Sequence, residues 1–139
     1  MDTSAGSETQ PVDEGELPGG TETILIVEDA TDVRILARRS LEERGYTVLV
    51  ARDAEEAMEI ANARRVDLLL TDIVMPQKNG IDLSKELRAV RPEMKTLFMS
   101  GYTDNSVVNL GMLTTETPFI QKPFTVAALH RKVREVLAV

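Results

Sequence analysis

The chain has 139 residues, of which 42% are hydrophobic and 28% are charged, a profile that predicts one globular domain with a sizeable core. Its formal net charge of -7 argues against nucleic acid or an anionic lipid surface as a partner. No cysteine is present, which excludes disulfides and thiolate metal sites. Neither a signal peptide nor a membrane-spanning apolar run is visible, so we expect a cytoplasmic domain without membrane contact.

The composition changes sharply near Thr21. Residues 1–20 contain no Lys or Arg, five acidic residues and two prolines. Such a stretch cannot bury enough apolar surface to fold. The sequence therefore predicts a flexible acidic tail or linker over residues 1–20 and one folded domain over residues 21–139.

From Thr23 onward, short apolar runs typical of strands buried on both faces of a parallel sheet alternate with segments of helical periodicity. The expected strands are Thr23 to Val27, Thr47 to Ala51, Asp67 to Thr71, Thr96 to Met99 and Phe119 to Gln121. The expected helices are Thr31 to Arg44, Asp53 to Arg64, a segment around Leu83 and Leu87 that ends at Arg91-Pro92, Asp104 to Leu113, and a last helix capped by Thr125. Five strand-helix units indicate a doubly wound α/β sheet.

Smaller features of the helices carry expectations of their own. Thr31 is predicted to be the N-cap of the first helix and Gly45 its C-terminal stop. His130 is the single histidine, and we expect it at the surface or compensating a helix dipole, with no catalytic role. Valines and a glycine lower the helix propensity between Asp104 and Leu113.

Charged residues follow three of the predicted strands. Glu28-Asp29 come after the first strand, Asp72 after the third and Lys122 after the fifth. The carboxyl ends of parallel strands meet at one edge of the sheet, where open α/β sheets bind their ligands. Carboxylates gathered there provide the hard oxygen ligands that a divalent cation prefers. The pattern therefore predicts a cation site and suggests phosphate chemistry.

Four motifs lie at the ends of predicted strands: Glu28-Asp29, Asp72 with Met75-Pro76, Ser100-Gly101, and Lys122-Pro123. Together they resemble the receiver domain of two-component response regulators, over about residues 21–139. The resemblance implies a flavodoxin-like fold, with a five-stranded parallel sheet in the order 2-1-3-4-5 flanked by five helices.

Asp72 is the candidate nucleophile. A carboxylate can attack phosphorus to form an aspartyl phosphate, a reaction that depends mostly on positioning and charge neutralisation. Mg²⁺ would supply that neutralisation. The resemblance implies that Asp29, Asp72 and the backbone carbonyl of Val74 bind Mg²⁺ directly and that Glu28 acts largely through water.

The resemblance also assigns roles to Lys122, Ser100 and Phe119. Lys122 is expected to contact the phosphoryl group as a point charge, Ser100 to donate its hydroxyl to that group, and Phe119 to change rotamer as part of the switch. Structural alternatives stay open: first-turn acids for Glu28 and Asp29, a turn residue for Asp72, a solvated lysine for Lys122, a loop cap for Ser100 and core packing for Phe119.

The predicted function is a phosphoacceptor switch in a phosphorelay. Asp72 would receive its phosphoryl group from a phosphohistidine on a histidine kinase or histidine phosphotransfer protein, and a second copy of the chain is a further candidate partner. Val74 and Tyr102 could crowd the attacking water, so we expect slow autodephosphorylation. The acidic tail, together with Ser100-Gly101-Tyr102-Thr103 and Gln121-Lys122-Pro123-Phe124, resembles receivers attached to hybrid sensor histidine kinases, with a stand-alone regulator as the alternative.

Two rival functions match the sequence less well. An aspartate-nucleophile phosphatase resembles a family with a second acid two positions after the nucleophile, where this chain has Val74. A flavin- or nucleotide-binding domain would place glycines after the first strand, where this chain has Glu28-Asp29-Ala30.

Segment 104–118, with the fifth strand and last helix, is the surface predicted to change on phosphorylation.

Overall fold

Five parallel strands form a single sheet in the order β2-β1-β3-β4-β5, which confirms the predicted fold. The computed structural model describes residues 19–75, 78–101 and 118–138. The strands are β1 (Thr23–Val27), β2 (Thr47–Ala51), β3 (Leu68–Asp72), β4 (Lys95–Gly101) and β5 (Phe119–Lys122). Their carboxyl ends all lie at one edge of the sheet, because every neighbouring pair is parallel.

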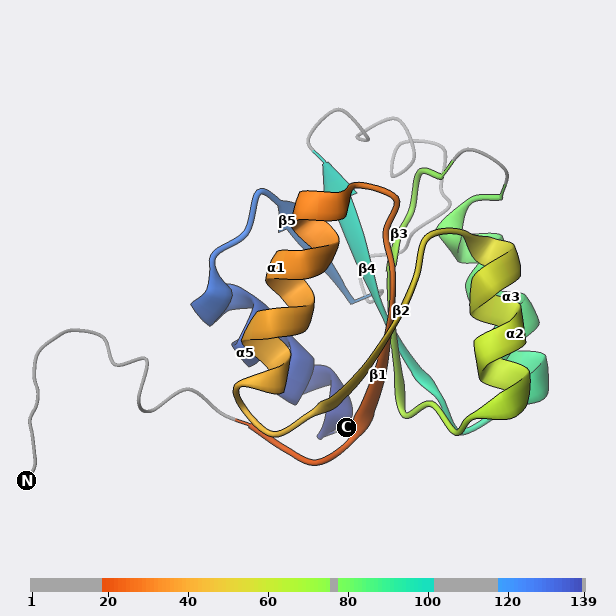
Figure 1. Cartoon of the computed structure of the whole chain (residues 1–139), viewed down its shortest axis with the longest axis horizontal. Coiled ribbons are helices and arrows are strands. Elements are labelled where there is room, and N and C mark those ends of the chain that lie inside the picture. The colour runs from red at the N-terminus through yellow and green to blue at the C-terminus, as the bar shows by residue number, and fades with distance from the viewer. Residues whose placement is uncertain (1–18, 76–77, 102–117, 139) are drawn as a thin grey trace, which may run out of the picture.

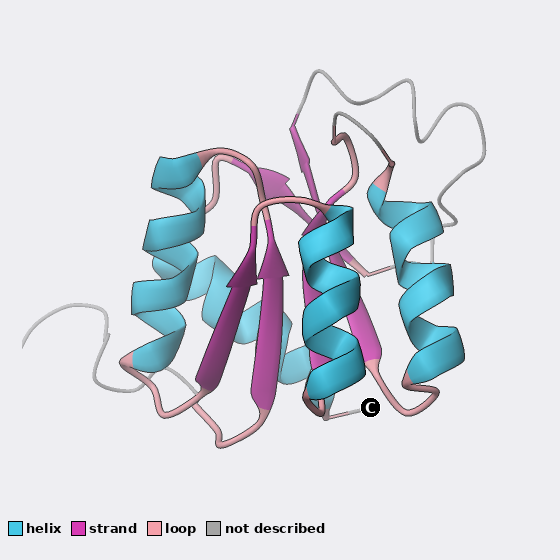
Figure 2. Ribbon diagram, turned by 45° about the vertical axis from the view of Figure 1, so that its right-hand side comes forward, coloured by secondary structure: helices cyan, strands magenta, loops and turns pink. Residues whose placement is uncertain are grey.

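Helices cover both faces of the sheet. The helices within the described ranges are α1 (Thr31–Glu42), α2 (Ala54–Ala63), α3 (Gly80–Val90) and α5 (Val126–Leu137). Helices α1 and α5 lie on one face and α2 and α3 on the other (Figures 1 and 2). The helix predicted at residues 104–113 lies outside the described residues. No helix of the described ranges is both long enough and apolar enough to cross a membrane.

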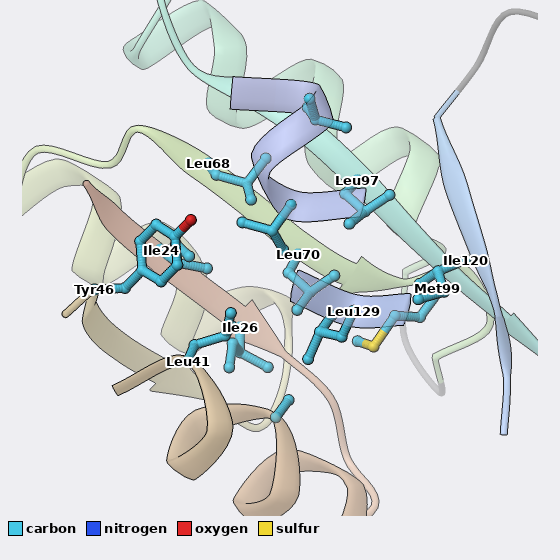
Figure 3. Close-up of a cluster of buried hydrophobic side chains, with 13 residues drawn as sticks. Ile24, Ile26, Leu41, Tyr46, Leu68, Leu70, Leu97, Met99, Ile120 and Leu129 are labelled. Atoms are coloured by element: carbon cyan, nitrogen blue, oxygen red, sulfur yellow. The ribbon is translucent and has the colours of Figure 1, made fainter. Parts of the chain in front are cut away.

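The core follows the twofold alternation of the strands. On β1, Ile24 and Ile26 pack with residues of α1 and α5 (Figure 3), whereas Leu25 and Val27 pack with residues of α2 and α3. All four side chains are fully buried, and burying each aliphatic side chain contributes about 1.5–3 kcal/mol. A slip of one residue would move every side chain to the opposite face. The strand register, and with it the position of each strand end, is therefore strongly specified.

Three strands end later than the sequence predicted: β3 at Asp72, β4 at Gly101 and β5 at Lys122. Asp72 is the last residue of β3 and pairs with Met99, rather than following the strand. Strand β4 continues to Gly101, because Ser100 pairs with Gln121 and Gly101 pairs with Lys122. Asp72, Ser100 and Lys122 thus lie on strands, whereas Glu28 and Asp29 follow the last residue of β1.

The beginning of α1 corrects one prediction. The N-cap is Ala30, which has no side-chain cap, and Thr31 is the first helical residue. The carboxylate of Glu28 accepts from the backbone N–H of Ala30 at 3.0 Å, so it provides the acceptor near the helix start that Thr31 was expected to provide. Gly45 has a φ of 101°, which confirms it as the residue after which the helix cannot continue.

His130 is buried, so its predicted surface position is wrong. It lies within α5 and is 1% exposed. Burial favours the neutral form of the imidazole over its charged form, and the nearby positive charge of Arg44 acts in the same direction. The pKa of His130 is therefore lowered. The backbone of Ser40 and the carboxylate of Glu43 act in the opposite direction. The buried stripe of α5 is broader than the spacing of its aliphatic residues predicted.

Helix α5 holds the chain where it enters the domain. The guanidinium of Arg134 donates to the carbonyl of Gly19 at 3.0 Å and to both carboxylate oxygens of Glu22, at 3.2 and 2.6 Å. The N–H of Gly20 donates to the carbonyl of Arg44 at 3.2 Å. Residues 19 and 20, the end of the predicted tail, therefore pack against the domain.

Candidate functional site

Glu28, Asp29 and Asp72 form an acidic cluster at the carboxyl edge of the sheet. One carboxylate oxygen from each residue lies within 4.8 Å of the other two. Strand β1 delivers Glu28 and Asp29 because they follow its last residue, and the adjacent β3 delivers Asp72. Glu28 and Asp72 are buried, whereas Asp29 is exposed. The cluster therefore has two covered acids and one that faces solvent.

Lys122 joins two of these acids. Its Nζ donates to Oδ2 of Asp72 at 3.0 Å and to Oε1 of Glu28 at 3.2 Å. Lys122 is the last residue of β5, and Pro123 follows it. The solvated-lysine alternative is thus wrong: the ammonium is a partner of the predicted nucleophile.

The charges of the site perturb one another. Burial raises the pKa of Glu28, and the charge of Asp72 adds to the rise, while the N–H of Ala30 and the ammonium of Lys122 oppose it. Burial alone would lower the pKa of Lys122, but the hydrogen bond and charge of Asp72, together with Glu28, raise it above its ordinary value. Lys122 therefore remains a cation, whereas Glu28 takes up a proton more readily than a free carboxyl, chiefly because it is buried.

The backbone around Asp72 is closely packed. The hydroxyl of Thr71 donates to the carbonyl of Asp72 at 3.0 Å, and the N–H of Val74 donates to Oδ1 of Asp72 at 3.4 Å. A Cβ atom at Gly80 would lie 2.1 Å from the Asp72 carbonyl oxygen. Only glycine fits at this position, which begins α3. The sequence alone did not indicate this contact.

The donor set fits a hard divalent cation. Mg²⁺ prefers oxygen ligands and typically takes one or two carboxylates, completing its shell with water and phosphate oxygens. Asp29 and Asp72 provide such oxygens within one cluster. Val74, whose carbonyl the family resemblance assigns to the metal, follows closely and has a side chain that is 51% exposed. The residues present are therefore suited to Mg²⁺.

Ser100 lies on β4, and Phe119 is the first residue of the neighbouring strand β5, where it pairs with Phe98. Ser100 is 5% exposed, and its hydroxyl donates to the carbonyl of Gly101 at 3.2 Å, a local contact of the kind the loop-cap alternative describes. Phe119 is 41% exposed, so its core-packing alternative is wrong. Its predicted change of rotamer stays a prediction. Tyr102 lies outside the described residues.

Arg34 also reaches the site and was not singled out from the sequence. Its Nη1 donates to the backbone carbonyl of Glu28 at 2.7 Å. No motif marks this residue, since other arginines occur on the same helix. The contact depends on where α1 passes the end of β1, which only the folded chain shows.

A family model described as the response regulator receiver domain matches residues 24–134. The chain belongs to this family. The predicted resemblance is therefore confirmed, and the acidic cluster with its lysine lies at the edge of the sheet where that resemblance placed it.

Individual relatives support the same assignment. The chain is 34% identical to the sensor kinase CckA of Brucella abortus over 98% of its own length but only 15% of the relative's, and 35% identical to the transcriptional regulatory protein CpxR of Klebsiella pneumoniae over 82% and 48%. It thus spans half or less of these curated relatives.

Solved structures of receivers have the same fold. The receiver domain of the hybrid histidine kinase CckA is similar with a TM-score of 0.69 and 34% identity, covering 83% of this chain and 98% of that one. A CheY-like receiver protein from Methanospirillum hungatei gives a TM-score of 0.72 and 31% identity, covering 86% and 95%.

Proposed function

We propose that this receiver domain is a phosphoacceptor switch in which Asp72 takes a phosphoryl group from a phosphohistidine. One observation carries the proposal: Lys122 bridges Asp72 and Glu28, and Asp29 completes an acidic cluster around the same point. A structural ion pair would need one carboxylate for one ammonium. The excess of carboxylates is instead suited to a bound divalent cation and an incoming phosphoryl group.

The transfer would form one bond and break another. A carboxylate oxygen of Asp72 attacks phosphorus, the phosphorus–nitrogen bond to the donor imidazole breaks, and that imidazole leaves with the bonding electron pair and takes a proton. Lys122 holds the attacking carboxylate before transfer, and its ammonium neutralises phosphoryl oxygens afterwards. Ser100 is proposed to donate its hydroxyl to those oxygens.

Mg²⁺ would be held by Asp29, Asp72 and the carbonyl of Val74. When bound, it neutralises negative charge on the phosphoryl oxygens. Glu28 is buried and already engaged by Ala30 and Lys122, so its proposed part is to keep the surrounding groups in place and to reach the metal through water.

The proposed partner is a histidine kinase or a histidine phosphotransfer protein in the cytoplasm. The similarity to CckA supports a place within a hybrid sensor histidine kinase, and a stand-alone regulator, alone or as a homodimer, is the alternative. These two cases share one site, and the open reading frame around the coding sequence distinguishes them.

Acetyl phosphate provides the test, because a small donor needs only the pocket. We expect intact-mass measurement to show one added phosphoryl group when Mg²⁺ is present, its loss in chelator, and no labelling of Asp72→Asn. Glu59→Gln, which changes an exposed acid on α2, serves as the matched control and should label normally. An acid-stable phosphate on Ser or Thr, or full labelling of Asp72→Asn, would contradict the proposal.

An aspartate-nucleophile phosphatase remains the rival. Such an enzyme would need an acid where Val74 presents an exposed apolar side chain. Multiple turnover of a generic phosphate ester would favour the rival, whereas a single stoichiometric phosphorylation favours the receiver.

A further inference from the structure

We propose that Arg34 is a positioning residue that aims Asp29 at the metal. The inference rests on the proposed function, since it concerns the same cation site. It assigns a role to a side chain that is on α1 and is itself neither a metal ligand nor a phosphate ligand.

Glu28 is held at four points by four different residues. Its N–H donates to the carbonyl of Ala51 at 3.2 Å, its carbonyl accepts from Nη1 of Arg34 at 2.7 Å, and its carboxylate accepts from Ala30 at 3.0 Å and from Lys122 at 3.2 Å. The Arg34 contact is the shortest of the four. It is also a charge-assisted hydrogen bond, which is stronger than a bond between neutral groups.

The contact acts on Asp29 through the peptide plane. The carbonyl of Glu28 and the N–H of Asp29 belong to one planar unit, so a donor that fixes the carbonyl direction also fixes the direction in which the chain enters Asp29. Within the described part of the chain, the structure shows no hydrogen bond to the Asp29 carboxylate, and the residue is exposed. Its aim therefore depends on its backbone, and Arg34 is the side chain that holds that backbone.

Arg34 is itself anchored. Its Nη2 donates to Oγ1 of Thr31 at 3.5 Å, a long contact, and its backbone N–H donates to the carbonyl of Ala30 at 3.0 Å. The guanidinium thus spans from the first turn of α1 to the end of β1. A movement of α1 relative to β1 would therefore change the orientation of Glu28 and Asp29.

The sign of the effect separates positioning from simple electrostatics. A guanidinium near a cation site repels the cation, so an Arg34 that acted only as a charge would weaken Mg²⁺ binding, and its removal would tighten it. A positioning residue has the opposite signature, because its removal leaves Asp29 free to turn away. Outer partners of metal ligands typically change metal affinity by about 10- to 100-fold when they are removed.

Calorimetric titration with Mg²⁺ tests the proposal. Arg34→Met keeps most of the apolar stem and removes the donor, and we expect its Kd for Mg²⁺ to rise roughly tenfold. Arg34→Lys, which keeps one donor and the charge, should recover most of the affinity. Arg39→Met changes an exposed arginine on the same helix and should bind like the wild type. If Arg34→Met does not fold, Arg34→Gln, whose amide is too short to reach the carbonyl, replaces it with the same expectation.

Other outcomes would overturn the inference. An unchanged or tighter Kd in Arg34→Met, with a melting temperature in chelator close to that of the wild type, would show that Arg34 does not aim Asp29. Equal losses in the Met and Lys variants would show the same. A folded wild type that binds no Mg²⁺ would overturn the proposed function as well, so the two failures are distinguishable.

Discussion

At the scale of single residues, the three acids of the site divide their roles. Glu28 has no exposed surface and gives one carboxylate oxygen to Ala30 and the other to Lys122. Asp29 is exposed, and Asp72 is buried beside the ammonium. Glu28 therefore fixes the backbone that follows β1, whereas Asp29 faces solvent and Asp72 is paired with Lys122.

Val74 leads to a prediction about the lifetime of the phosphorylated state. Its side chain is 51% exposed and follows Asp72 closely, where an apolar group can crowd a water molecule attacking in line. We expect Val74→Asn to shorten the lifetime of the aspartyl phosphate by roughly three- to tenfold, a change of about 1 kcal/mol in the barrier. Decay of the phosphorylated mass measures this. Leu36→Asn, at another exposed apolar position, should decay like the wild type, and equal rates in all three proteins would show that Val74 does not shield the phosphate.

The sequence predicted the charged residues of the site better than their supports. Asp72 and Lys122 were identifiable because each ends an apolar strand, and parallel strands place such ends together. Gly80 and Arg34 were not identifiable in this way, because each contacts a backbone carbonyl group, Gly80 that of Asp72 and Arg34 that of Glu28. Such contacts depend on loop conformation, which leaves no side-chain pattern in the sequence.

At the scale of elements, the strands were predicted more accurately than the helix ends. Strands β1 and β2 have the predicted bounds, since an apolar run between polar residues defines them. Helix α1 begins without the predicted Thr31 cap and ends at Glu42 rather than Arg44. Near its start the carboxylate of Glu28 accepts from the N–H of Ala30, a contact that the capping rule applied to Thr31 does not include.

The packing of α1 against α5 makes stability depend on pH through His130. Its pKa in the folded protein is lowered from the ordinary 6.5, and its Nδ1 is buried without a hydrogen-bond partner among the described residues. Below pH 6.5 His130 is protonated in the unfolded chain but stays neutral in the folded chain. The free energy of unfolding therefore falls as the pH decreases from 6.5 towards the folded pKa. Above pH 6.5 His130 makes no such contribution.

His130→Leu should remove this dependence. We expect the unfolding free energy of the wild type to fall relative to that of the variant as the pH decreases below 6.5, with a slope of at most about 1.4 kcal/mol per pH unit. Urea unfolding at pH 7.5 and at pH 5.5 measures the difference, and the shared carboxylates cancel in the comparison. Parallel pH profiles in the two proteins would show that His130 is not the responsible group.

At the scale of the whole molecule, the acidic cluster sets a balance between stability and cation binding. Like charges held within 4.8 Å of one another destabilise the folded state in the absence of a cation, because they separate when the chain unfolds. A cation that binds only the folded state stabilises it by RT ln(1 + [Mg²⁺]/Kd), about 2.7 kcal/mol at a hundredfold excess over Kd.

Thermal melts of Asp29→Asn and Asp72→Asn test this balance. In chelator we expect each variant to melt higher than the wild type because one of the like charges is removed, by about 1 kcal/mol or less for the exposed Asp29. Asp29→Asn is the cleaner of the two, because Asp72 also loses part of its bond with Lys122. Added Mg²⁺ should raise the melting temperature of the wild type and leave Asp29→Asn almost unchanged. The proposed metal site is contradicted if both variants melt at lower temperatures than the wild type in chelator and Mg²⁺ does not change the melting temperature of the wild type.

The contact between Arg134 and Gly19 has a consequence for how such a domain is connected. Strand β5 ends at the acidic edge, so α5 runs back to the opposite edge, where Arg134 meets the chain that leads into β1. Entry to and exit from the described fold therefore lie side by side, as in domains that tolerate insertion into a host chain. This entry and exit edge is the edge of the sheet opposite the acidic cluster, so chain connections made there would lie away from Glu28, Asp29 and Asp72.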